Sequence, residues 1–174
     1  ATFPIASDAE TAVEVNPGTV DKLKLMAYRN VGINRLSIGL HSTEDQELKM
    51  LGRIHTYKDF LDTYTLAREV GFQNINVDLM SGIPFQTLGG WEDTLKKVAE
   101  LGPEHISAYS LIIEEGTPFY EKNGEGERAE ARRRRELPDE DTERMMYQFT
   151  KNILWSYGYH RYEISNYAKE GYEC

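Results

Sequence analysis

The stretch "NINVDLMSGIPFQT" (residues 74–87) begins with the pattern of a strand and ends in a turn that contains glycine and proline. Apolar side chains alternate along it with Asn76 and Asp78, so the expected strand has one apolar and one polar face. Asp78 lies near the end of this strand, on the face opposite to the apolar one. The stretch therefore predicts a strand with one buried face. It also raises the question of which groups the carboxylate of Asp78 contacts.

The pattern around this strand recurs along the chain. Four segments each end a helical pattern with a glycine, which readily adopts the left-handed backbone that closes a helix. In each segment a strand-like stretch begins three residues later. The glycines are Gly32, Gly71, Gly102 and Gly158, and the strand-like stretches begin at Arg35, Asn74, His105 and Arg161. The spacing predicts a series of helix-to-strand connections.

Apolar residues spaced three or four apart predict helices over residues 60–67, 91–101 and 145–157. A further strand at residues 12–15 precedes a helix that begins near Val20. We expect helix caps at Ser42 with Asp45 and at Thr56 with Asp59, and a loop at Gly89 and Gly90. The last strand is expected near Tyr162. Alternation of strands and helices predicts a parallel sheet with helices outside it, in a barrel or a doubly wound sheet.

The two faces of the expected strands favour the barrel. One set of side chains is apolar and is expected to meet the helices: Leu36, Ile38, Leu40, Ile75, Val77, Leu79, Ile106 and Ala108. The other set is mixed: Ser37, Gly39, His41, Asn76, Asp78, Met80, Ser107 and Tyr109, with Glu14 on the preceding strand. A doubly wound sheet needs two apolar faces, whereas a barrel interior can be polar and hold a ligand. Asp78 is then aimed into the barrel near its carboxyl-terminal mouth; a turn cap or a structural ion pair remains the alternative.

Composition limits the classes of function. The chain has 174 residues, a formal net charge of -9 and one cysteine. The negative charge argues against nucleic acid as a partner, and one cysteine suits a cytoplasmic protein without disulfides. No run of apolar residues is long enough for a transmembrane helix, so we expect a cytoplasmic protein that is not an integral membrane protein.

Ordered motifs along nearly the whole chain point to a family. They read "EVNPGTV", "GINRLSIGLHS", "LGRIHTY", "GFQNINVDLMSGIPFQT", "GPEHISAYSLIIEEGTPFY" and "YGYHRYEISNYA". Together they resemble the radical S-adenosylmethionine (SAM) proteins related to anaerobic coproporphyrinogen III oxidase, most closely the HemW-like haem-chaperone branch. The resemblance implies that residues 1–174 form a partial (β/α) barrel of the TIM-like type, the radical SAM core. A barrel fragment of an unrelated enzyme with the same helix-to-strand spacing is a further alternative.

The resemblance implies a set of cofactor-binding residues. Glu14 resembles the family's acidic residue at the methionine part of S-adenosylmethionine, and Arg53 the partner of the methionine carboxylate. Asp78 resembles the acceptor for the ribose hydroxyls. His41 stands where relatives usually carry glutamine, so it is the one departure from the family's set. The same resemblance implies a [4Fe-4S] cluster and an electron donor that reduces it.

The family's cluster loop, Cys-x3-Cys-x2-Cys, does not occur in this chain. We therefore expect the chain to be a fragment of a longer protein, with the cluster ligands outside it, no metal ligand within it, and no cluster role for Cys174. The alternative is a complete relative without a cluster.

The resemblance leaves two functions open. The first is a haem chaperone, a carrier that binds haem. The second is oxygen-independent coproporphyrinogen III dehydrogenase, an enzyme that converts propionate side chains to vinyl groups. The partner is haem or coproporphyrinogen III accordingly, and whether the protein is an enzyme stays open. The histidines at positions 41, 55, 105 and 160 have no metal-binding spacing; any of them could serve haem, or be a surface or strand-end residue. The charge run over residues 124–144 is interpreted as a connector rather than an anion-binding patch.

Overall fold

The structure is a computed structural model that describes residues 6–117, 119–120 and 136–174. Strands and helices alternate over most of this part of the chain. The strands are β1 (Ala12–Val15), β2 (Arg35–His41), β3 (Ile75–Ser81), β4 (His105–Ser110), β5 (His160–Arg161) and β6 (Asn166–Ala168). The helices are α1 (Lys22–Asn30), α2 (Asp45–Met50), α3 (Tyr57–Glu69), α4 (Leu88–Leu101) and α7 (Glu140–Ser156). Each strand start expected from the glycine pattern lies within one residue of an observed one.

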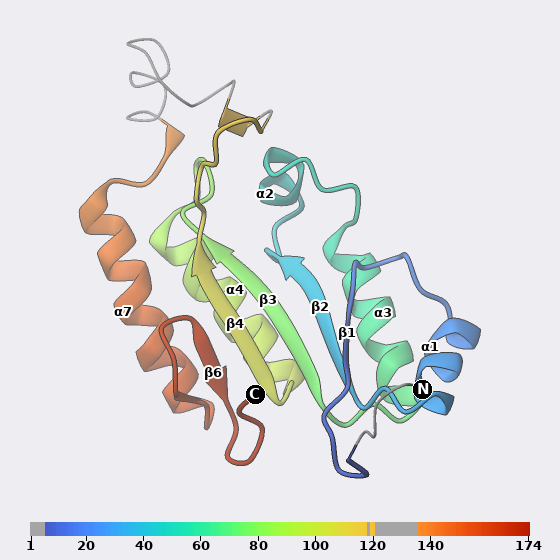
Figure 1. Ribbon diagram of the computed structural model, residues 1–174. Helices are drawn as coiled ribbons and strands as arrows, with labels where there is room; N and C mark the ends of the chain where they lie inside the picture. Colours follow the sequence, from blue (N-terminus) through green and yellow to red (C-terminus); the bar gives the residue numbers. More distant parts are fainter. Residues whose placement is uncertain (1–5, 118, 121–135) are drawn as a thin grey trace.

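The described strands form one sheet in the order β1-β2-β3-β4-β6-β5. The first four are parallel neighbours, as the alternating pattern predicts. Figure 1 shows these strands with their carboxyl ends at the same edge, with α3 and α4 behind the sheet and α2 beyond the end of β2. The arrangement is the wall of a partial barrel, with helices on its outer side.

The face that meets the helices is the main hydrophobic core. The predicted apolar set of β2 and β3 is fully buried, with Leu36, Ile38, Leu40, Ile75, Val77 and Leu79 each 0 % exposed. Phe60 of α3 and Trp91 of α4 belong to the same cluster. The prediction of one apolar face and one mixed face is therefore confirmed.

The end of the sheet differs from the prediction. We expected one more parallel strand near Tyr162, but the chain forms the two short strands β5 and β6, which pair antiparallel. β6 in turn lies antiparallel to β4. The reason is local: the chain reverses after Arg161, and the backbone N–H of Tyr162 donates to the carbonyl of Asn166. A glycine after a helix predicts that a strand follows but not the direction in which it pairs.

Two of the expected local features are wrong and one is confirmed. Thr56 caps α3 in a reciprocal capping box with Asp59. Ser42 does not cap α2, whose N-cap position is Glu44 without a side-chain cap bond. Gly90 lies in the first turn of α4, not in a loop, because Thr87 accepts its N–H and starts the helix at Leu88.

Candidate functional site

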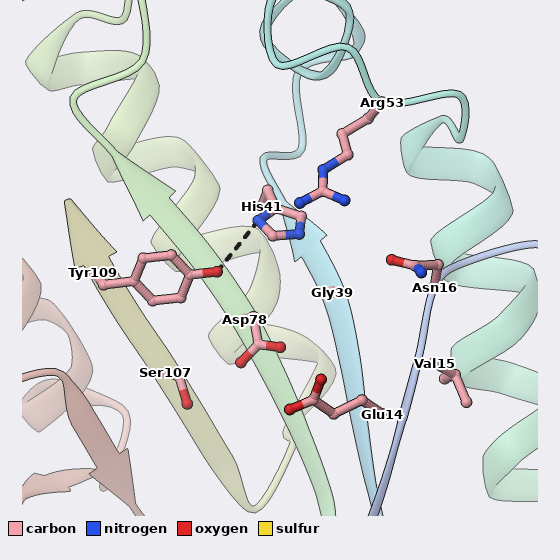
Figure 2. A pocket seen from close by; sticks show the side chains of 9 residues that line it. All are labelled: Glu14, Val15, Asn16, Gly39, His41, Arg53, Asp78, Ser107 and Tyr109. Carbon is pink, nitrogen blue, oxygen red and sulfur yellow. Dashed lines mark hydrogen bonds between the residues drawn. The ribbon is translucent and has the colours of Figure 1, made fainter. Parts of the chain in front are cut away.

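The concave face of the sheet holds a cavity of about 590 Å³. Figure 2 shows the side chains that line it, which come from all four parallel strands and from the loop after α2. They are Glu14, Val15, Asn16, Gly39, His41, Arg53, Asp78, Ser107 and Tyr109. The four residues predicted for the site, Glu14, His41, Arg53 and Asp78, all lie here. Sequence positions 64 residues apart thus meet at one cavity near the carboxyl ends of the strands.

Strand register explains why these side chains meet. Gly39 of β2 is paired with Asp78 of β3, and Asp78 with Ser107 of β4. One level below, Glu14 is paired with Ser37, and Ser37 with Asn76. Because side chains alternate between faces, residues two apart on a strand lie on the same face of the sheet. Figure 2 shows the carboxylates of Asp78 and Glu14 near one another on this face.

Asp78 is held by donors from its own strand and from β2. The amide Nδ2 of Asn76 donates to Oδ1 of Asp78 at 2.8 Å, and the hydroxyl of Ser37 donates to Oδ2 at 3.2 Å. The pKa of Asp78 is raised above its ordinary value, chiefly by burial; the hydrogen bonds from Asn76 and Ser37 act against this rise, and the nearby charge of Glu14 adds to it. These two hydrogen bonds hold the carboxyl group of Asp78 at the cavity wall, where its two oxygens can still accept from a ligand. Within the described residues, no basic side chain forms an ion pair with it.

His41 lies at an irregular point of β2. The register of β2 against β3 shifts between Gly39 and His41, and His41 has a φ of 72°. Its ring folds back over Gly39, where an added Cβ would lie 3.1 Å from Nε2 of His41. Burial, followed by the charge of Arg53, lowers the pKa of His41 to about 4. The imidazole is therefore neutral at physiological pH, with Nδ1 at 3.5 Å from the hydroxyl of Tyr109.

Arg53 reaches the cavity because of how α2 ends. Gly52 takes a φ of 71°, its N–H donates to the carbonyl of Lys49, and the N–H of Arg53 donates to that of Leu48. These are the two bonds of a Schellman motif, which turns the chain back at the helix end. Figure 2 shows the guanidinium pointing from this loop toward His41. Among the described residues, neither this guanidinium nor the carboxylate of Glu14 has a hydrogen-bond or ion-pair partner.

Some cavity residues were not predicted to be functional. Gly39, Ser107 and Tyr109 belong to the mixed face that was expected to point inward, but no role was predicted for them. Asn16 was missed, and its only signal is the "EVNP" motif that also holds Glu14. A second cavity of about 200 Å³ shares Arg53 with the first and has mostly apolar walls, from Leu51, Met80, Leu111, Ile112 and Phe119.

The ring of each of the four histidines has a hydrogen-bond partner. Besides His41, the ring of His55 bonds the carbonyl of Leu40 at 3.2 Å, His105 bonds Asn76 and Tyr162, and His160 bonds Glu173. Within residues 6–117, 119–120 and 136–174, no group of three metal-binding side chains is found. The arginine run at residues 132–135 lies outside the described residues, so its interpretation stays a prediction. In the part that the structure describes, no helix has the length and apolar character needed to cross a membrane.

A partial barrel whose concave face gathers these polar groups near the carboxyl ends of its strands is the core of a radical SAM protein. The chain belongs to the radical SAM superfamily, whose family model matches residues 4–98. It is 41% identical over 170 residues to "Heme chaperone HemW" of Bacillus subtilis, covering 98% of this chain and 43% of that protein. It is 39% identical over 174 residues to the protein of the same name from Escherichia coli, covering 100% and 43%.

The solved structure of the coproporphyrinogen III oxidase HemN from Escherichia coli, a radical SAM enzyme, has the same fold. Its TM-score is 0.79 at 28% identity, over 97% of this chain and 37% of that one. The family and the fold class predicted from the motifs are confirmed. The chain spans less than half the length of the relatives it matches, so the activity of the whole protein is a matter for proposal.

Proposed function

We propose that this chain is the S-adenosylmethionine-binding part of a haem chaperone of the HemW type. The observation that carries the proposal is the convergence of Glu14, His41, Arg53 and Asp78 on one cavity. The support for the chaperone comes from relatives of that name, which match nearly the whole chain. Haem as the partner, an electron donor, the cytoplasmic location and the lack of nucleic-acid binding remain predictions.

The residues of the cavity fit S-adenosylmethionine. The volume of about 590 Å³ lies in the range of about 300–1,000 Å³ common for small-molecule sites. The unpartnered guanidinium of Arg53 suits a carboxylate, which it can bind through two parallel hydrogen bonds. The two carboxyl oxygens of Asp78 can accept from two ribose hydroxyls. Glu14 offers acceptors for the amino group of the methionine part, and the neutral ring of His41 can accept or donate one hydrogen bond.

Bound together with a reduced [4Fe-4S] cluster, S-adenosylmethionine supplies a 5′-deoxyadenosyl radical. The chain has one cysteine, Cys174, so three cysteine ligands for that cluster would come from outside these 174 residues. The task of this chain is to bind and orient the cofactor and to keep water from it. The apolar cavity beside Arg53 gives room for an apolar part of a substrate close to the cofactor site.

A second candidate is coproporphyrinogen III dehydrogenase. The observation that favours it is the similarity of the fold to HemN over nearly the whole chain. Higher identity to the chaperones favours the first candidate. The two functions are distinguished in the full-length protein by measuring haem transfer to an acceptor protein and the release of carbon dioxide from coproporphyrinogen III.

The cofactor assignment is tested by titration calorimetry on the full-length protein. S-adenosylhomocysteine is the ligand, because it cannot be cleaved. We expect Asp78→Asn and Arg53→Gln each to weaken binding at least about tenfold, the loss of one charge-assisted contact. Asp62→Asn and Arg144→Gln are matched controls, since both residues lie on the surface in helix ion pairs. Unchanged affinity in both site variants would contradict the assignment.

A further inference from the structure

Below Asp78 a chain of hydrogen bonds runs through the interior away from the cavity. Asn76 donates to Asp78 as described, and Oδ1 of Asn76 lies 2.6 Å from Nδ1 of His105. On the other side of the ring, Nε2 of His105 lies 2.8 Å from the hydroxyl of Tyr162. The two middle residues are buried, with Asn76 4 % and His105 1 % exposed. The sequence placed His105 at the start of a strand and assigned it no link to Asp78.

In this series of hydrogen bonds, the groups that can only accept determine where the protons lie. An ionised Asp78 only accepts, so the amide of Asn76 must turn its NH2 group toward it. This leaves Oδ1 of Asn76, also only an acceptor, facing His105, so Nδ1 carries the ring proton. Nε2 is then an acceptor and can accept a hydrogen bond from the Tyr162 hydroxyl, which also lies 3.1 Å from Sγ of Cys174. All donors thus point toward Asp78, and no other tautomer of His105 satisfies both of its neighbours.

The surroundings of His105 keep this arrangement in place. Burial, with a smaller contribution from the charge of Arg35, lowers the pKa of His105 to about 4, while the charge of Glu173 acts in the opposite direction. The ring is therefore neutral at physiological pH, as the tautomer argument requires. Without the N–H of His105, only the hydroxyl of Ser107, at 3.2 Å, would still donate to Oδ1 of Asn76. The amide would then have one partner fewer on its carbonyl oxygen, so its orientation toward Asp78 would be less firmly fixed.

We propose that His105 is a positioning residue for the cofactor site, which acts through Asn76 to hold the carboxylate of Asp78 correctly rotated for a ribose diol. The proposal rests on the proposed function, because it assumes that Asp78 accepts from the ribose. His105 itself does not line the cavity. Its contribution is therefore to the preference for two ribose hydroxyls rather than to binding in general.

The test compares two ligands in the full-length protein, S-adenosylhomocysteine and its 2′-deoxy analogue. His105→Leu removes the ring protons, and we expect it to weaken binding of the first ligand about tenfold and of the second much less. His105→Asn places an amide NH2 near the position of Nδ1, so it should restore most of the affinity. Tyr162→Phe should give a smaller loss, because Nδ1 still donates to Asn76 while Nε2 loses the hydrogen bond that holds the other side of the ring.

Tyr159→Phe is the matched control. The hydroxyl of Tyr159 is buried and donates to the carbonyl of Pro103 at 2.6 Å. The variant therefore also loses one tyrosine hydrogen bond, but one that is not part of the hydrogen-bond series leading to Asp78. We expect its affinity for both ligands to equal that of the unmodified protein. Equal losses in Tyr159→Phe and Tyr162→Phe would mean a structural role only and would overturn the proposal.

Two further outcomes separate this proposal from the proposed function. Unchanged preference for the ribose diol in His105→Leu, with weak binding by Asp78→Asn, overturns the role of His105 alone. Unchanged binding by Asp78→Asn removes the premise of this proposal, and unchanged binding by both Asp78→Asn and Arg53→Gln overturns the cofactor assignment. If His105→Leu does not fold, His105→Asn and Tyr162→Phe decide, together with the ¹⁵N chemical shifts of the His105 ring in the unmodified protein. A proton on Nε2 instead of Nδ1 would contradict the inference.

Discussion

His41 combines a left-handed backbone with a buried imidazole at one position of a strand. A non-glycine residue with positive φ costs on the order of 1–3 kcal/mol unless its surroundings compensate. Here the ring lies over Gly39, where no side chain competes for the space, and beside Tyr109 in an edge-to-face contact. The strained residue lies in the wall of the candidate cavity, as do the groups of Arg53 and Glu14, which have no hydrogen-bond or ion-pair partner in the described part of the chain. Strain and unsatisfied groups thus occur together at the site.

The two buried histidines of the concave side make the fold sensitive to acid. The folded-state pKa of His41 and of His105 is about 4, below the unfolded value of 6.5. Their contribution to stability is therefore complete above pH 6.5 and is lost as the pH falls toward about 4, because the unfolded chain takes up the protons first. The upper limit of the loss is about 3 kcal/mol for each imidazole.

Urea unfolding of the chain on both sides of this pH window measures the effect. His41→Gln removes one of the two groups, so its unfolding free energy should fall less with pH than that of the unmodified chain. The comparison between the two chains cancels the carboxylates, including Asp78, whose raised pKa acts in the opposite direction. The same pH dependence in both chains would show that His41 is not buried as a neutral ring.

At the scale of the element, α3 depends on its N-terminal cap. The hydroxyl of Thr56 accepts from the N–H of Asp59 at 3.2 Å, and the carboxylate of Asp59 accepts from the N–H of Thr56 at 2.8 Å. Thr56→Ala should lower the free energy of unfolding by about 1 kcal/mol. Thr65→Ala in the same helix is the control, because Thr65 is exposed and alanine favours a helix interior. Chemical denaturation checks both, and equal effects would argue against the cap.

The two expected caps show what the sequence can and cannot predict. Ser42 with Asp45 and Thr56 with Asp59 have the same spacing, yet only the second pair caps a helix. The hydroxyl of Ser42 instead donates to Glu47 at 2.6 Å, a carboxylate that Gln86 from another loop also contacts. The local pattern therefore predicts the possibility of a cap, and side chains from distant segments decide whether it forms.

The candidate site was predictable in part for the same reason. Alternation along the strands placed Asp78, His41 and Glu14 on the inner face, because that property is local to each strand. Arg53 was assigned by family resemblance, since its position depends on the turn after α2. The link from His105 to Asp78 runs from β4 through Asn76 of β3, and no local pattern indicates it.

In the described part of the chain, one face of the sheet is covered by helices and β1 is the longer of its two edge strands. Helices α3 and α4 cover the outer side (Figure 1), and within residues 6–117, 119–120 and 136–174 β1 pairs only with β2. An edge strand with unpaired backbone groups readily pairs with another chain. The net charge of -9 opposes such association by repulsion between chains. Strand pairing between two copies of the chain acts only at short range. Encounters between copies become more frequent as the protein concentration rises, so we expect pairing to outweigh the repulsion at high concentration.

We therefore expect this chain, expressed alone, to self-associate through β1 with increasing concentration. Ala12 is an exposed residue of β1, and Ala12→Lys places a charge at the edge, which opposes strand pairing. Asn152→Lys on the exposed face of α7 changes the net charge by the same amount away from the edge. Sedimentation velocity at rising concentration should show oligomers for the unmodified chain and for Asn152→Lys, and less association for Ala12→Lys. A monomer at every concentration, or equal effects of the two lysines, would mean that the edge of β1 is not a pairing surface.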